Sequence, residues 1–352
     1  MLAMESDFHE RPPAPEDQAR VGLVDLRKGC HFTSIAETSA WNWQQGSMLQ
    51  WLKSSGGHEL VYNTRQDGQF ASVVHNLRTR HSRTLPHPVY AVSADGRQAV
   101  TLSFSRLADC LPGAGYVGVP DPGAQDLAPA ADGIWLMDLR TGESELTISL
   151  AQLVAHEHHR AMDNAKHWVN HLRFNPDGSR FAVLHQWSDQ AGGPRHYRML
   201  TAKPDGSDLQ VVCDYELVTH YDWLDQERVL TWARQMDLGD RFYLFHVLSG
   251  RRDVVGYGTL EQDGHCSYSP DRRWILTDTY PDQESKRTLI LYRPADDLRL
   301  ELGRFAADPR AFGGHGCDLH PRWSRDGKRV CFDSVHEGSR QMYVMDVARI
   351  VA

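Results

Sequence analysis

Alternating apolar and polar positions recur along most of the chain in short runs that are separated by polar turns. YAVSADGRQAVTLSF and LRFNPDGSRFAVLHQW each contain a strand pattern, an Asp-Gly turn and a second strand pattern, and a third run such as WLMDLRTGES usually follows. Asp and Gly suit such turns because they tolerate positive φ. The alternation predicts antiparallel strands with one buried face, and six such units are visible.

Four histidines mark the first strand of successive units. His171, His220, His265 and His320 each stand three residues before an aromatic side chain, at intervals of 49, 45 and 55 residues. A repeat of this period is typical of stacked or radial units. A pair of β-sandwiches would not explain one motif at a constant register. The pattern therefore predicts an all-β propeller with six visible repeats, in which equivalent positions lie around one axis.

The repeats also predict the organisation of the chain. Residues 1–20 are acidic and contain several prolines, so we expect a mobile N-terminal arm, followed by one propeller domain over residues 21–352. The last unit ends after its third strand, so residues 22–36 are expected to complete that blade and close the ring. An insertion is expected at about 106–166, with a Gly- and Pro-rich loop that is functional or disordered and then a helix.

Composition narrows the classes of partner. The net charge of -8 argues against nucleic acid, which needs a basic face. No apolar run approaches the roughly 20 residues of a membrane span, and the N-terminal residues lack a signal-peptide pattern. The six cysteines are scattered, which is typical of reduced thiols in a cytoplasmic protein. We expect neither a nucleic-acid nor a membrane partner, and the oligomeric state is not indicated.

The histidine register favours a functional site over a structural slot, because Met48 and Val89 occupy it in the first two units. Two of the histidines have the surroundings of a metal site. Cys317 stands three residues before His320, which is metal-ligand spacing, and His265 comes from the neighbouring unit. Histidine with cysteine suits zinc, whereas manganese prefers more oxygen ligands. We expect His265, Cys317 and His320 to bind a divalent metal, Zn or Mn.

The other two histidines have the surroundings of an acid–base site. His171 and His220 are accompanied by His185, Arg195 and Tyr221. Imidazoles transfer protons near neutral pH, a guanidinium binds a carboxylate and a phenol can donate a proton. These five residues are the predicted catalytic set, with an anionic ligand as the expected substrate.

The turn sequences SPD and SRDG resemble those of TolB-like propellers. The strings HLRFNPDGSRFAVLH, GHCSYSPDRRWILTDTYPD and CDLHPRWSRDGKRVCFDS resemble oligogalacturonate lyases and related propeller-fold polysaccharide lyases, including ulvan lyases, from about residue 40 onward. The resemblance implies a seven-bladed propeller that cleaves uronic-acid-containing oligosaccharides by β-elimination. It implies a histidine base at His220, an assisting arginine at Arg195, and a manganese-type site with histidines at His265 and His320.

The chain departs from the oligogalacturonate lyase pattern at two positions. Cys317 stands where those lyases have a metal-binding glutamine, and Arg322 where they have a third histidine. The metal site therefore looks more like the His/Cys zinc site of ulvan lyases, whose catalytic histidine pair would correspond to His171 and His185.

The hypothesis is a uronide lyase in which His220 removes the C5 proton and His185, His171 or Tyr221 protonates the leaving oxygen. One alternative is a non-catalytic TolB-like propeller that binds a sugar, peptide or protein at its channel mouth. A metal-dependent hydrolase is the third.

Overall fold

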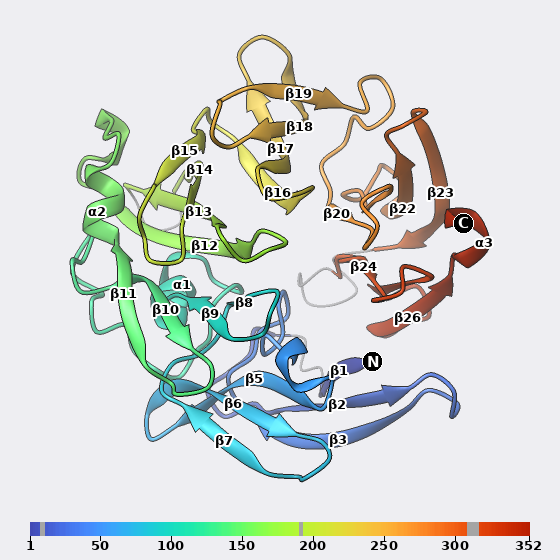
Figure 1. Cartoon of the computed structure of the whole chain (residues 1–352), viewed down its shortest axis with the longest axis horizontal. Helices are drawn as coiled ribbons and strands as arrows, with labels where there is room; N and C mark the ends of the chain where they lie inside the picture. The colour runs from blue at the N-terminus through green and yellow to red at the C-terminus, as the bar shows by residue number, and fades with distance from the viewer. Residues whose placement is uncertain (8–10, 190–192, 308–316) are drawn as a thin grey trace. The chain divides into compact units, whose positions relative to one another are not determined.

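The chain folds into seven antiparallel sheets of three or four strands each, the blades of a seven-bladed β-propeller (Figure 1). The computed structural model describes residues 1–7, 11–189, 193–307 and 317–352. Its contacts divide the chain into two compact units, Met1–Val211 and Val212–Ala352. No helix among these residues is both long and apolar enough to cross a membrane.

The first unit contains four sheets. Their strands are β1 (Leu2–Ser6), β2 (Ala19–Asp25) and β3 (His31–Thr38); β4 (Gln50–Leu52), β5 (Glu59–Gln66), β6 (Gln69–Asn76) and β7 (Ser82–Leu85); β8 (Ala91–Val92), β9 (Gln98–Thr101), β10 (Gly133–Asp138) and β11 (Ser144–Ser149); and β12 (Lys166–Phe174), β13 (Phe181–Ser188), β14 (His196–Ala202) and β15 (Gln210–Cys213). The turn between β5 and β6 shows the local rule: Asp67 and Gly68 have φ of 51° and 75°, as a tight two-residue hairpin requires.

The second unit contains three sheets. Their strands are β16 (Val218–Trp223), β17 (Arg228–Gln235), β18 (Gly239–His246) and β19 (Arg252–Val255); β20 (Ser267–Tyr268), β21 (Ile275–Thr277), β22 (Lys286–Arg293) and β23 (Leu298–Ala306); and β24 (Arg322–Trp323), β25 (Arg329–Ser334) and β26 (Gln341–Asp346), before the short helix α3 (Ala348–Val351). Alternate apolar positions pack between neighbouring blades, as Leu276 and Leu289 do against Val330 and Phe332. The first strand of each of these blades either carries one of the in-register histidines or begins two residues after it.

The N-terminal segment corrects two of the predictions. Leu2–Ser6 form β1, which pairs with β2 instead of being part of a mobile arm, because the apolar side chains of Leu2 and Met4 pack against the cluster around Val21 and Leu60. Residues 22–36 do not complete the last blade. They pair with β1 to make a sheet of their own, and the sheet β24–β26 has three strands. The seventh blade is therefore the N-terminal one.

The expected insertion is built into the first unit. Two of its segments are β10 and β11, strands of the third blade, and the stretch expected to be a loop begins inside helix α1 (Phe104–Cys110). The helix predicted over 149–166 is confirmed only in its first part, as α2 (Leu150–Ala155), which begins with a capping box between Ser149 and Gln152. Of the two readings of the loop, functional or disordered, the disordered one is wrong over 111–132, because Arg106 bonds this segment at several points.

Candidate functional site

Three of the four in-register histidines meet in the second unit. His220 lies in β16, and His265 and His320 each stand two residues before the start of β20 and β24, the first strands of their blades. Figure 1 shows these strands at the inner ends of the three blades. The ring centroids of His220 and His265 are 4.1 Å apart, and those of His265 and His320 are 3.9 Å apart. The repeated register therefore produces a contiguous row of imidazoles.

A carboxylate fixes the orientation of His220. Its Nδ1 lies 3.0 Å from Oδ1 of Asp263, and the Thr219 hydroxyl donates to the same carboxylate at 3.0 Å. A carboxylate accepts but does not donate, so Nδ1 carries the proton of the neutral ring and Nε2 is the basic nitrogen. This is the arrangement of an oriented general base.

A second carboxylate fixes His265. Its Nδ1 lies 2.9 Å and 3.0 Å from the two oxygens of Asp278, which is buried and also accepts the His265 backbone N–H at 2.7 Å. Burial alone would lower the pKa of His265, but the charge and hydrogen bond of Asp278 raise it. A carboxylate on one imidazole nitrogen leaves the other as the ligand, which is the usual outer arrangement of a metal-binding histidine.

Three side chains present metal-ligand atoms to one point. Nitrogen atoms of His265 and His320 and a carboxylate oxygen of Asp318 all lie within 4.8 Å of one another. Nδ1 of His320 is buried and has no hydrogen-bond partner among the residues that the structure describes. Burial lowers the pKa of His320 well below its ordinary value, so the ring is neutral and its lone pair can bind a cation. The donor set of two nitrogens and one oxygen fits a divalent metal ion.

Cys317 does not belong to this set, which corrects the predicted ligand list. It is buried, its Sγ lies 3.6 Å from the Asp318 carbonyl oxygen, and burial raises its pKa to about 11. Asp318, two residues before His320, is the residue of this segment that joins the two histidines in the group. That spacing was visible in the sequence. Arg322 is paired with Asp333 at 2.8 Å and takes no part in the cluster.

Arg287 and Tyr280, which the sequence interpretation did not select, complete the site. The Arg287 guanidinium is nearly buried and pairs with Oδ1 of Asp318 at 2.5 Å, while Oδ2 of Asp318 lies 4.0 Å from Nε2 of His265. The Tyr280 ring lies under the guanidinium, at 5.4 Å. Its centroid is 6.3 Å from that of His220 and 6.5 Å from that of His265. Neither residue is part of the repeat, which is why the register did not indicate them.

His185 lies in the first unit, and its surroundings there are structural. It is fully buried; its Nδ1 accepts from Nε of Arg198 at 3.0 Å, and its Nε2 lies 2.9 Å from Nδ1 of His167. His167 in turn donates from Nε2 to the Met162 carbonyl at 3.1 Å. Both rings are thus neutral donors in one directed chain from Arg198 to Met162. A ring that has both nitrogens in hydrogen bonds and no access to solvent does not suit a residue that donates a proton to the substrate. This corrects the predicted role of His185.

The remaining predicted residues are placed as follows. His171 has φ of 53°, and its backbone N–H donates to the Tyr90 hydroxyl at 3.0 Å. Arg195 is exposed and its guanidinium lies 5.8 Å from the centre of the Tyr197 ring. Tyr221 is buried next to His220 in the sequence. His171 and Arg195 belong to the first unit and Tyr221 to the second, and their catalytic roles stay predictions.

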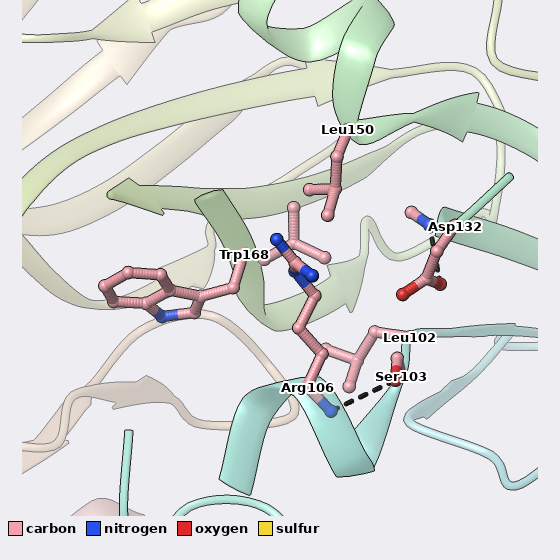
Figure 2. A pocket seen from close by; sticks show the side chains of 8 residues that line it. Leu102, Ser103, Arg106, Asp132, Leu150 and Trp168 are labelled. Carbon is pink, nitrogen blue, oxygen red and sulfur yellow. Dashed lines mark hydrogen bonds between the residues drawn. The ribbon is translucent and has the colours of Figure 1, made fainter. Parts of the chain in front are cut away.

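A pocket is lined by residues of the first unit only, and the side chain of Arg106 that fills part of it has a structural role (Figure 2). Arg106 extends from α1 into it and bonds main-chain carbonyls, including that of His167 at 2.7 Å. Burial raises the pKa of Asp132, whose Oδ1 accepts from the Gly133 N–H at 2.7 Å. The residues that line it and are labelled in the figure are Leu102, Ser103, Arg106, Asp132, Leu150 and Trp168. Because its guanidinium is already engaged, the pocket does not offer an anion site.

The buried histidine pair predicts a pH-dependent stability of the first unit. Burial lowers the pKa of His167 to about 4 and that of His185 well below its ordinary value. Below the unfolded-state pKa of about 6.5, the unfolded chain binds protons that the folded chain does not, so stability is complete above that pH and is lost as the pH falls toward 4. The expected slope is roughly 1.4 kcal/mol per pH unit for each ring.

Urea unfolding at several pH values in this window measures the slope. A double variant, His167→Gln with His185→Gln, should flatten it, whereas His81→Gln, at an exposed histidine of the same unit, should leave it unchanged. An unchanged slope in the double variant would contradict the assignment of the neutral pair.

Comparison with known proteins shows a likeness of fold. No protein-family model matches the chain, and the search of curated proteins found no match. Among solved structures, oligogalacturonate lyase from Vibrio parahaemolyticus is 14% identical with a TM-score of 0.51, over 99% of this chain and 97% of that one. An oligogalacturonate lyase in complex with manganese is 12% identical with a TM-score of 0.53, over 98% and 96%.

The likeness extends to propellers of other proteins. The β-propeller domain of the Trilobed protease from Pyrococcus furiosus is 13% identical with a TM-score of 0.52, over 87% of this chain and 81% of that one. The shared property is the fold. A propeller fold is shared by proteins of different activity, so the function has to be argued from the histidine row and its carboxylates.

Proposed function

We propose that this protein is a carbon–oxygen lyase that cleaves uronic-acid-containing oligosaccharides by β-elimination. The observation that carries the proposal is the row of His220, His265 and His320, in which the first ring is oriented as a base and the other two face a carboxylate in a metal-ligand group. β-Elimination next to a carboxylate needs these two functions together, a base for the C5 proton and a positive charge for the carboxylate.

The proton chemistry belongs to His220. Its Nε2 takes the C5 proton, and Asp263, 3.0 Å from Nδ1, stabilises the imidazolium that forms. The C5 carbanion, delocalised into the carboxylate, then expels the glycosidic oxygen from C4, and the product is an unsaturated uronate. Asp278 holds His265 in a fixed tautomer throughout and is not itself a proton carrier.

The charge balance of the site supports a bound cation. Asp263, Asp278 and Asp318 carry three negative charges, and Arg287 supplies one positive charge. An anionic sugar would be repelled by this set. His265, Asp318 and His320 would hold a divalent cation, Zn or Mn, and the chemistry that such an ion supplies is neutralisation of the substrate carboxylate, which acidifies the C5 proton.

The test is turnover of a panel of oligouronides by the whole protein, followed by the ultraviolet absorbance of the conjugated product and its mass. We expect an unsaturated product from at least one uronide and none from the matching neutral oligosaccharides. Hydrolysis products without the double bond would instead indicate a metal-dependent hydrolase. The absence of any product would refute the proposal.

A non-catalytic propeller is the second candidate, because the fold is shared with the propeller domain of a protease. Calorimetric titration with the same oligosaccharides separates the two. Binding of an uncleaved sugar by the wild-type protein, with no product after prolonged incubation, would favour the binding protein.

The cation site gives a prediction that does not depend on activity. Zn or Mn at about 100 times its dissociation constant should raise the free energy of unfolding by about 2.7 kcal/mol. The variant Asp318→Asn with His320→Ala should lose this shift. Asp296→Asn, at an exposed acid paired with Arg293, is the control that should keep it.

Cys317→Ser separates the two ligand sets. It should keep the cation-induced shift, because Cys317 lies outside the group formed by His265, Asp318 and His320. If Cys317→Ser lost the cation-induced increase in stability, the ligand set predicted from the sequence would be supported and the set that contains Asp318 would be contradicted.

A further inference from the structure

The proposed elimination needs a proton donor for the departing oxygen, and two of the three donors predicted from the sequence, His185 and Tyr221, are buried. His185 is buried in the chain that joins Arg198 to His167. Tyr221 is buried, with 6% of its surface exposed. A donor must reach a substrate that is also in contact with His220. The second unit contains a side chain that meets this requirement.

Tyr280 lies beside the base and is open to solvent. The residue is 49% exposed, and its ring centroid is 6.3 Å from that of His220 and 6.5 Å from that of His265. Its hydroxyl makes no hydrogen bond to any residue that the structure describes. The phenol therefore combines access, nearness to the base and an uncommitted O–H group.

A positively charged side chain lies beside the Tyr280 ring. The Arg287 guanidinium lies 5.4 Å from the ring centre, where a cation is attracted to the ring and would stabilise the negative charge that develops on the oxygen as the proton leaves.

We infer that Tyr280 is the general acid of the proposed lyase reaction. His220 takes the proton from C5, the C4–O bond breaks with its electron pair leaving on oxygen, and the Tyr280 hydroxyl gives its proton to that oxygen. The imidazolium and phenolate left at the end are restored by one proton transfer through solvent. No oxidant, reductant or further reactant is needed. This inference rests on the proposed function and adds a residue to it.

Leaving-group dependence tests the inference. Tyr280→Phe keeps the ring and its contact with Arg287 but removes the proton. On a uronide whose leaving group is a sugar alkoxide, we expect kcat to fall by about 100-fold, with KM nearly unchanged. On a uronide that carries 4-nitrophenolate at C4, which leaves without protonation, Tyr280→Phe should retain activity close to that of the wild type.

The matched control is Tyr257→Phe. Tyr257 is another exposed tyrosine of the second unit with a guanidinium over its ring, that of Arg241 at 5.6 Å, and this variant should match the wild type on both substrates. Thermal unfolding of both variants verifies that the fold is kept.

The outcomes are distinct. Equal activity of Tyr280→Phe and the wild type on the sugar leaving group overturns the inference and leaves the lyase proposal standing. An equal loss on both leaving groups also overturns it, because it would show that Tyr280 acts in binding. A wild-type protein inactive on every uronide overturns the proposed function, and this inference with it.

Discussion

Replacing His220 by alanine is expected to lower kcat on a cleaved uronide by between about 100-fold and 10,000-fold, the range measured for loss of a general acid–base group. The physical reason is that the other two imidazoles of the row, His265 and His320, belong to the proposed cation group. KM should change much less, because His220 is assigned to proton transfer and not to holding the sugar. Steady-state kinetics on the substrate found in the panel measures both constants.

Asp263→Asn tests the tautomer and orientation of the His220 ring while the histidine itself is kept. The amide keeps the size of the side chain but can donate a hydrogen bond to Nδ1, which would shift the proton to Nε2 and remove the basic nitrogen. We expect a loss of kcat approaching that of His220→Ala, with the site otherwise intact.

His246→Ala is the control for these two variants. His246 is a partly exposed histidine of the same unit that also has a carboxylate near its ring, Asp253 at 3.7 Å. It should leave kcat unchanged. Full activity of His220→Ala would show that the base is another residue.

Most of the fold could be predicted from the sequence because the repeated pattern specifies strands and turns locally. Alternation and Asp-Gly turns specify strands and hairpins locally, and His171, His220, His265 and His320 all lie at or beside the first strand of a blade. The N-terminal blade was missed because β1 to β3 lack the histidine and the Asp-Gly turn. Their pairing depends on contacts between Met4 and residues far along the chain, which a local pattern does not encode.

The candidate site was predictable in part. Register brought the histidines of the second unit together, but the side chains that give each ring its role come from elsewhere. Asp263 is two residues before His265 yet bonds His220, and Asp278 comes from the end of the neighbouring strand. The choice of Cys317 over Asp318 followed a spacing rule, which does not specify which side chains of a non-strand segment reach the same point. Arg287 and Tyr280 reach the site through tertiary packing alone.

Arg198 illustrates the opposite case, a charged residue whose importance is structural. Its side chain is fully buried. Nε donates to His185, Nη1 donates to the His156 carbonyl at 3.0 Å, and Nη2 donates to the Leu153 carbonyl. These carbonyls belong to the C-terminal end of α2, where a cation is favoured by the helix dipole. The guanidinium therefore ties α2 to β14 of the blade β12–β15.

Arg198→Met is expected to lower the free energy of unfolding by about 3–5 kcal/mol, because it leaves two or more buried acceptors without their donor at a cost of about 1–3 kcal/mol each. Methionine fills much of the volume, so the loss reports the hydrogen bonds more than a cavity. Urea unfolding measures the loss, and hydrogen exchange of residues 150–165 should show the largest increase. Arg195→Met, three residues away on an exposed side chain, should change stability by less than about 0.5 kcal/mol. Equal losses of stability in the two variants would mean that the buried hydrogen bonds of Arg198 contribute nothing. The same Arg195→Met variant also has a second use. If it is stable but turns over uronides more slowly, that result would support the role that the resemblance gives to Arg195.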